Sequence, residues 1–454
     1  MKFINDIRPN GLWIEALLAT TVVAGLVWAI AFLILNGFLP HPFFYEPSDT
    51  FMDWYNSAYW AYDKGRYDSW GSVYPPLSFA VLRMFSFSSC YQGAEGLTSR
   101  DCDWLGIVVI HVIFVLNAIL IALTFLKIDR KTALPRSIAL SIGLPMLFAL
   151  ERGNLLLITF TCILLGYGPL LKSARLRWLA VGLAINFKFY LIASLFPQLL
   201  KRRWRWFEGA AVTTLFIYVI SYIVVGNGSP IDIIKNTLYL NDAYEAGGFL
   251  DGWYASTYKP FLSVLEGKYV PVNSIIGSAN VDLLTFLLPI LQYTTQLMVV
   301  LAVIMTWFRP EAVSMFRLTN LGIGMAVITS ETGGYVHALV ILFTFMERWR
   351  GIGLKWSIVA CYVLCIPADI VIDRLVPVFR ESFLGGRPVI FDFALTLGPF
   401  IRPLILMSIP FALACVTIRE VWKDIQDQGR KFRWRYRHDA PIMAGSGTAS
   451  PPAR

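Results

Sequence analysis

The chain has 454 residues, of which 56% are hydrophobic and only 15% carry a charge, and its mean hydropathy is +0.59. This balance excludes an ordinary soluble domain. The net charge of +9 does not indicate nucleic acid as a partner, because cytoplasmic segments of membrane proteins are enriched in Lys and Arg. Apolar runs of about 20 residues, long enough to cross a bilayer, recur along the chain. The composition therefore predicts a polytopic integral membrane protein.

The first apolar run covers residues 13–39 and is too long for the apolar region of a signal peptide, so we interpret it as a retained span. Lys2 and Arg8 precede it, which favours a cytoplasmic N-terminus. Residues 38–103 are then a first extracytoplasmic loop. Cys90 and Cys102 lie in this loop, where an oxidising compartment would allow a disulfide.

Residues 49–77 of this loop are unusually rich in charged and aromatic side chains. Asp49 and Asp53 begin the stretch, and Tyr74-Pro75-Pro76-Leu77 ends it. The two prolines make a stiff turn that can start a helix, and residues 77–87 have the pattern of a short amphipathic helix at a membrane surface. A polar loop in this position suits chemistry on a lipid-linked substrate. An ordinary outer loop with aromatic interface anchors is an equally weighted alternative.

Further spans are assigned so that the clusters of Lys and Arg that separate them stay on the cytoplasmic side of the membrane. They cover residues 104–126, 137–150, 155–171, 208–225, 282–307, 312–328, 336–346, 356–372 and 394–417. Residues 226–280 form a second large extracytoplasmic loop, and residues 330–335 form the outer tip of a hairpin. Residues 1–418 make one transmembrane domain, followed by a basic cytoplasmic tail, 419–454, that is expected to be partly disordered.

Residues 178–200 are about one span long but lead into the basic block 201–205. A single crossing would place this block outside, against the positive-inside rule. Two half-helices that meet at Asn186-Phe187-Lys188 would keep it inside, because broken helices are tolerated where they line a protein-walled cavity. Lys188 is then a candidate site residue, and a purely structural ion pair is the alternative.

The sequence thus predicts an all-α bundle of about 11–13 transmembrane helices, some broken or short, with two larger extracytoplasmic loops that carry interfacial helices. The prominent polar residues gather on the side opposite the basic clusters. They are Asp49, Asp53, Arg152, Lys188, Glu331 and His337.

Four motifs occur in order along the chain. The first is Asp49 followed by Gly65, Tyr67 and Tyr74-Pro75-Pro76-Leu77. The second is Arg152-Gly153-Asn154-Leu155-Leu156-Leu157, the third is Lys188-Phe189-Tyr190, and the fourth is Gly334-Tyr335-Val336-His337. Together they resemble GT-C fold, polyprenyl-phosphate-dependent glycosyltransferases, most closely the mannosyltransferase-like family 87. The family's third motif ends in a proline that is absent here, and its fourth has Trp where this chain has Gly334.

This resemblance implies an inverting glycosyltransferase in which Asp49, or alternatively Asp53, is the general base. The residues implied in binding the donor phosphate and substrate are Arg152, Asn154, Lys188, Tyr74, His337 and Glu331. The donor would be a polyprenyl-phosphate sugar (mannose or another hexose or pentose), and the acceptor a glycolipid or polysaccharide. No cofactor is required, and a divalent metal stays an open alternative. The expected location is a bacterial inner membrane, with both termini cytoplasmic and the active site on the periplasmic side.

Two other functions fit a multispanning chain with buried polar groups. A transporter or flippase would use those groups as a translocation path. A polysaccharide polymerase for lipid-linked sugars would also have many spans and large outer loops.

Overall fold

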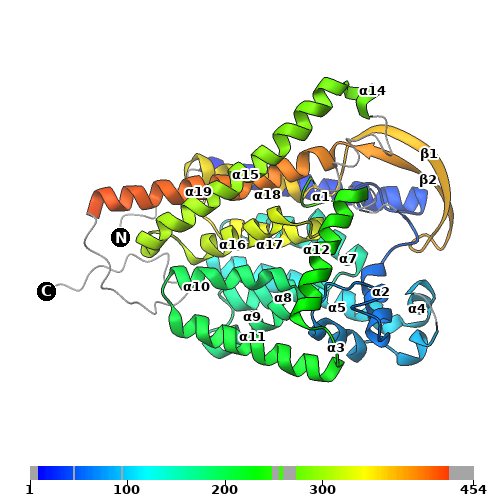
Figure 1. Ribbon diagram of the computed structural model, residues 1–454. Coiled ribbons are helices and arrows are strands. Elements are labelled where there is room, and N and C mark those ends of the chain that lie inside the picture. The colour runs from blue at the N-terminus through cyan, green and yellow to red at the C-terminus, as the bar shows by residue number, and fades with distance from the viewer. Residues whose placement is uncertain (1–8, 44–45, 94–95, 248–254, 259–271, 429–454) are drawn as a thin grey trace.

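The computed structural model describes residues 9–43, 46–93, 96–247, 255–258 and 272–428, and most of these residues are helical (Figure 1). Six helical segments are long and apolar enough to cross a membrane, among the described residues: α1 (Pro9–Asn36), α5 (Trp104–Ile128), α6 with α7 (Ala133–Ser141 and Leu144–Arg152), α11 (Trp204–Val225), α15 (Ser278–Phe308) and α19 (Gly398–Gln428). This confirms a mostly helical, polytopic membrane protein.

Shorter helices complete the bundle. They are α8 (Leu156–Tyr167), α9 (Ala174–Phe187), η2 (Phe189–Leu195), α10 (Phe196–Leu200), η4 (Pro310–Ala312), α16 (Met315–Thr329), η5 (Gly334–Val336), α17 (His337–Phe345) and α18 (Gly351–Leu364). The helices of the connecting segments are α2 (Met52–Tyr62), α3 (Pro76–Met84), η1 (Ser88–Tyr91), α4 (Gly96–Cys102), α12 (Pro230–Gly247) and α14 (Val272–Ile276). The number of spans, predicted as 11–13, stays a prediction.

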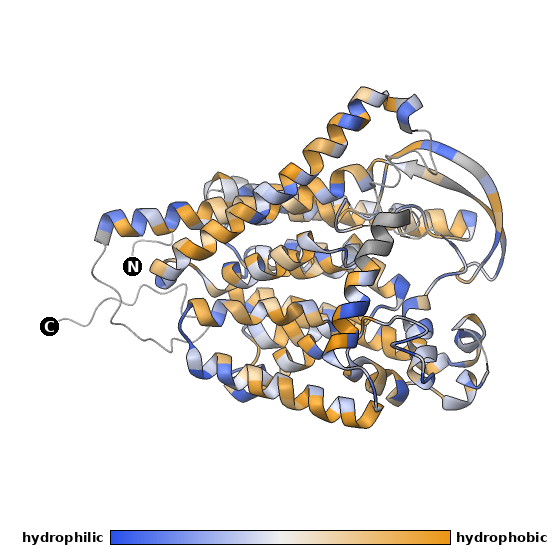
Figure 2. Ribbon diagram, viewed as in Figure 1, coloured by the Kyte–Doolittle hydropathy of each residue, from blue (hydrophilic) through white to orange (hydrophobic). Residues whose placement is uncertain are grey.

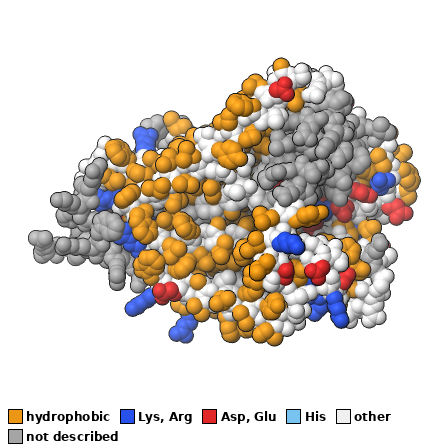
Figure 3. All heavy atoms as spheres, in the orientation of Figure 1, with side chains coloured by type: hydrophobic (Ala, Val, Ile, Leu, Met, Phe, Trp, Pro, Cys, Tyr) orange, Lys and Arg blue, Asp and Glu red, His pale blue; other side chains and the backbone are white. Residues whose placement is uncertain are grey.

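The outer surface of the bundle is apolar along the long helices. Large side chains such as Leu35 on α1, Val112 on α5 and Ile223 on α11 are more than half exposed. Figure 3 shows hydrophobic side chains over the middle of the bundle, and Figure 2 shows the polar residues toward its two ends. An apolar belt of this extent would be unfavourable in water and suits a lipid bilayer.

Buried ion pairs tie the helices together at one end of the bundle, which we call the basic end. Glu15 of α1 is fully buried and binds Arg136 of α6, with 2.7 Å between Oε2 and Nε. Arg317 at the start of α16 binds Glu347 at 2.8 Å and also pairs with Glu420 near the end of α19. The other end, which carries α2 to α4, α12 and the β-hairpin, is called the loop end.

The helix predicted to break at Lys188 does break there. α9 ends at Phe187, Lys188 has an extended backbone, and η2 and α10 continue from Phe189. Arg177 near the start of α9 interacts electrostatically with Arg203 after α10. Both basic clusters therefore lie at the basic end, and Lys188 is the turning point at the loop end.

The predicted all-α, polytopic class holds for most of the chain, but the prediction missed one pair of strands. Strands β1 (Val371–Ser382) and β2 (Arg387–Thr396) form an antiparallel hairpin at the loop end, where Phe379 pairs with Ile390. Side chains of β2 alternate between buried and exposed, as is typical of a strand: Phe391 is buried, and its neighbour Ile390 is 68% exposed. The spans expected at 356–372 and 394–417 are shifted accordingly: α18 ends at Leu364 and α19 begins at Gly398.

Other expected boundaries shift by a few residues. The helix expected at 77–87 is α3, Pro76–Met84, and the span expected at 137–150 is interrupted at Ile142 and Gly143, between α6 and α7. α19 continues to Gln428, so the first ten residues of the expected tail, 419–428, are helical. Lys2, Arg8, residues 429–454 and parts of the loop 226–280 lie outside the described residues.

Candidate active site

The two candidate carboxylates lie where the start of α2 meets the end of α7. Asp49 precedes α2, and Asp53 lies in its first turn, where a negative charge is favourable. Phe51 between them has a left-handed backbone (φ 65°), and its N–H donates to the carbonyl of Glu151 at 2.7 Å. This hydrogen bond brings the last turn of α7 next to both aspartates.

Arg152, the last residue of α7, binds both carboxylates. Its guanidinium forms an ion pair with Oδ2 of Asp49 and another, at 2.8 Å, with Oδ1 of Asp53. The following residue, Gly153, ends the helix with φ 63°, and a Cβ there would lie 3.2 Å from the carbonyl oxygen of Phe51. Glycine is favoured both by this conformation and by the close approach of the two chains.

Asn154 orients Asp53. Its Nδ2 donates to Oδ2 of Asp53 at 2.6 Å, and its Oδ1 accepts from the N–H of Leu156 at the start of α8. Both oxygens of Asp53 are therefore occupied, one by Arg152 and one by Asn154.

Asp49 is less constrained than Asp53. Oδ2 accepts from Arg152, and within the described part of the chain no donor is bound to Oδ1. Burial raises the pKa of Asp49 above its usual value of 3.8, although the neighbouring guanidinium of Arg152 opposes this effect. A carboxylate with a free oxygen and a raised pKa is suited to accept a proton.

Lys188 enters the same cluster from the break between α9 and η2. Its Nζ lies 4.5 Å from the centre of the Tyr74 ring and 5.5 Å from that of Tyr335, so two aromatic faces contact the ammonium group. Nζ also donates to the Tyr74 hydroxyl at 3.5 Å, and Lys188 interacts electrostatically with Asp53. Burial raises the pKa of Tyr74, so its hydroxyl stays protonated.

Of the eight predicted site residues, six are joined by direct interactions: Asp49, Asp53, Tyr74, Arg152, Asn154 and Lys188. Glu331 and His337 are described by other contacts. The Glu331 carboxylate accepts six hydrogen bonds, from the N–H and hydroxyl groups of Ser256 and Thr257 and the N–H groups of Thr332 and Gly333. Glu331 thereby joins residues 255–258 to residues 330–335, the hairpin tip between α16 and α17. His337 is fully buried at the start of α17.

Sequence reasoning did not single out Tyr335 or Glu151. Tyr335 stacks on Phe148 of α7, with ring centres 5.9 Å apart, and so connects the hairpin tip to the helix that carries Arg152. Glu151 is buried and interacts electrostatically with Arg152, Asp49 and Asp53. Their contacts join segments far apart in the chain, and the sequence carries no local signal for them.

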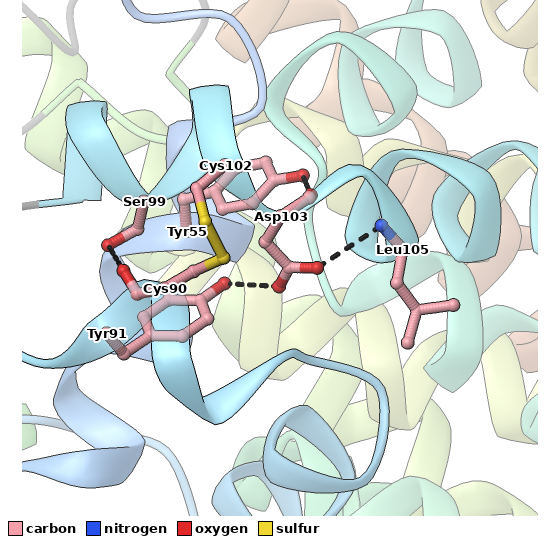
Figure 4. Close-up of a disulfide and its surroundings, with 7 residues drawn as sticks. All are labelled: Tyr55, Cys90, Tyr91, Ser99, Cys102, Asp103 and Leu105. Carbon is pink, nitrogen blue, oxygen red and sulfur yellow. Dashed lines mark hydrogen bonds between the residues drawn. A yellow bond between two sulfur atoms is a disulfide. The ribbon is translucent and has the colours of Figure 1, made fainter.

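A disulfide stabilises the first outer loop behind the site. Cys90 and Cys102 are bonded, with Cα atoms 5.7 Å apart (Figure 4). Beside it, Asp103 accepts from the Tyr91 hydroxyl at 2.8 Å, and its backbone carbonyl accepts from the Tyr55 hydroxyl of α2 at 2.6 Å. The helix that carries Asp53 is therefore held against the start of α5.

The lining of an apolar groove of about 880 Å³ includes Pro75 and Phe189, the sequence neighbours of Tyr74 and Lys188. The groove is lined by the segment that follows Lys188 and by α11, α15 and α16; the lining residues include Pro75, Phe189, Ile192, Leu215, Val299 and Met325. Leu215 is 64% exposed and Ile192 is 49% exposed, so the groove is open on the apolar outer surface. Its size and lining suit a hydrocarbon chain.

Comparisons with protein-family models, with curated proteins and with solved structures gave no match. The resemblance to family 87 therefore rests on the four sequence motifs. Within the described residues, no group of three or more His, Cys, Asp or Glu side chains is arranged to hold a metal ion. The cluster can supply a proton acceptor and two cations beside an apolar groove.

Proposed function

We propose that this chain is a membrane glycosyltransferase that moves a sugar from a polyprenyl phosphate to a glycan or glycolipid acceptor, with inversion, on the extracytoplasmic side. The observation that carries the proposal is the cluster itself. Asp49, whose Oδ1 binds no donor from the described residues, lies in one site with two cations, Arg152 and Lys188. The sequence neighbours of Tyr74 and Lys188 line an apolar groove.

Each part of the cluster has a role in the proposed reaction. Asp49 accepts the proton of the acceptor hydroxyl as that oxygen bonds to the anomeric carbon. The bond between the anomeric carbon and the phosphate oxygen breaks, and polyprenyl phosphate leaves with the electron pair. Lys188 stabilises the negative charge on the phosphate. A single attack opposite to the leaving group inverts the anomeric centre, as in the inverting glycosidases.

The groove supports a lipid-linked donor over a soluble one. Its lining includes Pro75 and Phe189, the direct sequence neighbours of Tyr74 and Lys188. A phosphate next to Lys188 would therefore place its hydrocarbon chain in the groove, open to the bilayer. A soluble nucleotide sugar would leave this apolar surface uncovered.

The test is a transfer assay in membranes that contain the chain, with a panel of radiolabelled polyprenyl-phosphate sugars and extracted membrane glycolipids as acceptors. We expect one donor to label the acceptor fraction with the wild-type chain and not with Asp49→Asn. Membranes without the chain are the background. Equal labelling by wild type, Asp49→Asn and the double variant with Asp53→Asn would contradict the proposal.

A further inference from the structure

Three aromatic rings, one exposed and two partly buried, meet at the far end of α2 from the site. Trp60, in the last turn of α2, stacks on Trp70 with ring centres 6.0 Å apart and planes 24° apart. Tyr59 contacts the edge of Trp70, at 5.7 Å between centres. Trp70 is 44% exposed. We call Tyr59, Trp60 and Trp70 the aromatic platform.

The platform is held rigidly. The indole N–H of Trp70 donates to Oδ2 of Asp63 at 2.8 Å, and Oδ1 of Asp63 accepts from the N–H of Gly65. Arg66, which is buried, donates to the backbone carbonyls of Trp60, Ala61 and Asp63. A large apolar ring is thus fixed in an exposed position, an arrangement that costs free energy unless a ligand covers the ring.

Trp60 of the platform lies on the same face of α2 as Asp53, which shares Arg152 with the candidate base Asp49. Asp53 and Trp60 are seven residues apart on one helix, which is two turns, so their side chains leave the same face about 10 Å apart along the axis. A sugar chain that reaches from the carboxylate cluster along α2 would place a further sugar unit over the platform.

The surroundings of the platform favour a carbohydrate over lipid. Lys64, Asp68 and Ser69 are exposed in the same turn, and charged side chains are unfavourable against hydrocarbon. The hydrogen bond from Trp70 lowers the pKa of Asp63, which stays ionised and can accept from hydroxyl groups. Sugar rings present C–H groups on one face, which pack on aromatic rings, and hydroxyl groups at their edges.

We propose that Tyr59, Trp60 and Trp70 bind a sugar unit of a glycan acceptor, adjacent to the unit whose hydroxyl reacts beside Asp49. The placement of the reacting unit rests on the proposed function. The binding of a glycan to the platform does not depend on transfer.

Binding is tested with the full chain in lipid nanodiscs and three linear probes: α-1,6-mannotriose, α-1,5-arabinotriose and maltotriose. Saturation-transfer NMR should show that at least one probe binds the wild type in the millimolar range. Trp70→Ala should weaken this binding by about tenfold or more, as should Tyr59→Ala, which keeps the hydrogen bond to Asp63. Asp49→Asn should bind like the wild type, so failure of transfer and failure of the platform are distinguishable.

Two results would overturn the proposal. One is the absence of binding by all three probes, or binding that is unchanged in both Trp70→Ala and Tyr59→Ala. The other is quenching of Trp70 by brominated phosphatidylcholine, which would make it a membrane anchor. Trp28 on α1, 43% exposed among apolar neighbours, is the matched control. Trp28→Phe should remove emission that the brominated lipid quenches. Trp70→Phe should remove only emission that the brominated lipid does not quench.

Discussion

Asn154 donates a hydrogen bond of 2.6 Å to Oδ2 of Asp53, across 101 positions of sequence. The amide is itself oriented by the backbone of α8, through the N–H of Leu156. Because Arg152 binds the other oxygen of Asp53, this carboxylate is fully used in holding the end of α7 against α2. Asp49 shares the same arginine, but its Oδ1 binds no donor from the described residues. This difference favours Asp49 over Asp53 as the proposed base.

The first prediction separates these two aspartates. Asp49→Asn keeps the shape of the side chain but removes the proton acceptor, so turnover should fall by about 10²–10⁴. Asp53→Asn keeps Asp49 and should lower turnover less, while weakening the contact with Arg152. Sugar transfer is measured with both variants at equal amounts of folded protein, checked by size exclusion. An inactive Asp53→Asn together with an active Asp49→Asn would reverse the assignment.

The second prediction concerns the pH dependence of transfer. Asp49 acts as a base only when ionised, and burial raises its pKa above the usual 3.8. On acidification, Asp49 should therefore become protonated at a higher pH than an ordinary aspartate does. The value of kcat/KM should fall as this protonation occurs. The acidic limb of the kcat/KM profile should have its midpoint above 3.8 and should persist in Asp53→Asn. A midpoint at or below that value, or an identical limb in the residual activity of Asp49→Asn, would argue against Asp49.

Part of this arrangement could be predicted from the sequence because it depends on local patterns. The charge of residues 201–205, one span-length after Arg177, was enough to predict the break at Lys188. The spacing of apolar runs predicted α1, α5, α11 and α15 within a few residues. Charge and hydropathy act over single segments, so they can be read without knowing which segments meet.

The remaining features depend on contacts between distant segments. The pairing of Asp53 with Arg152 and Asn154 requires α2 to meet the end of α7, and no local pattern specifies that contact. The β-hairpin was missed because most of it, residues 373–393, lies between two expected spans and was assigned no structure of its own. Four of the six hydrogen bonds that the Glu331 carboxylate accepts come from residues 256 and 257, a contact that no local pattern predicts.

The third prediction tests the turn at Lys188. Ala174→Cys at the start of α9 and Arg205→Cys in the first turn of α11 should be labelled from the same side of the membrane, because both lie at the basic end. Cys162, Cys361 and Cys365 are buried, and Cys90 and Cys102 are in the disulfide. Cys415 is free and only partly buried, so the variants carry Cys415→Ser. Ser69→Cys, exposed at the loop end, is the control for the opposite side. In intact cells an impermeant maleimide should label Ser69→Cys alone, and labelling of only one of the other two would exclude the half-helix arrangement.

The fourth prediction concerns Glu331 as a positioning residue. Glu331→Gln replaces one acceptor oxygen by a donor among groups that all donate, so buried N–H or hydroxyl groups lose their partner. The free energy of unfolding should fall by about 1–3 kcal/mol, measured by thermal unfolding in detergent. Glu208→Gln, at an exposed position on α11, should change stability by less than about 0.5 kcal/mol. Equal stability of both variants would show that the hydrogen-bonded carboxylate does not hold the hairpin tip.

The fifth prediction compares two lysines at the two ends of the segment formed by η2 and α10. Lys188 lies between Tyr74 and Tyr335 at the loop end, and Lys201 donates to the carbonyl of Val313 at the basic end. If Lys188 stabilises charge on the departing phosphate, Lys188→Ala should lose about 2–4 kcal/mol of transition-state stabilisation in kcat/KM, the size found for a lost electrostatic donor. Lys201→Ala removes the same charge far from the cluster and should leave kcat/KM unchanged per folded molecule. Lys188→Arg keeps the charge and should restore part of the activity. A normal kcat/KM in well-folded Lys188→Ala would remove Lys188 from the site, and a loss confined to the yield of folded protein would make it a structural cation of the turn.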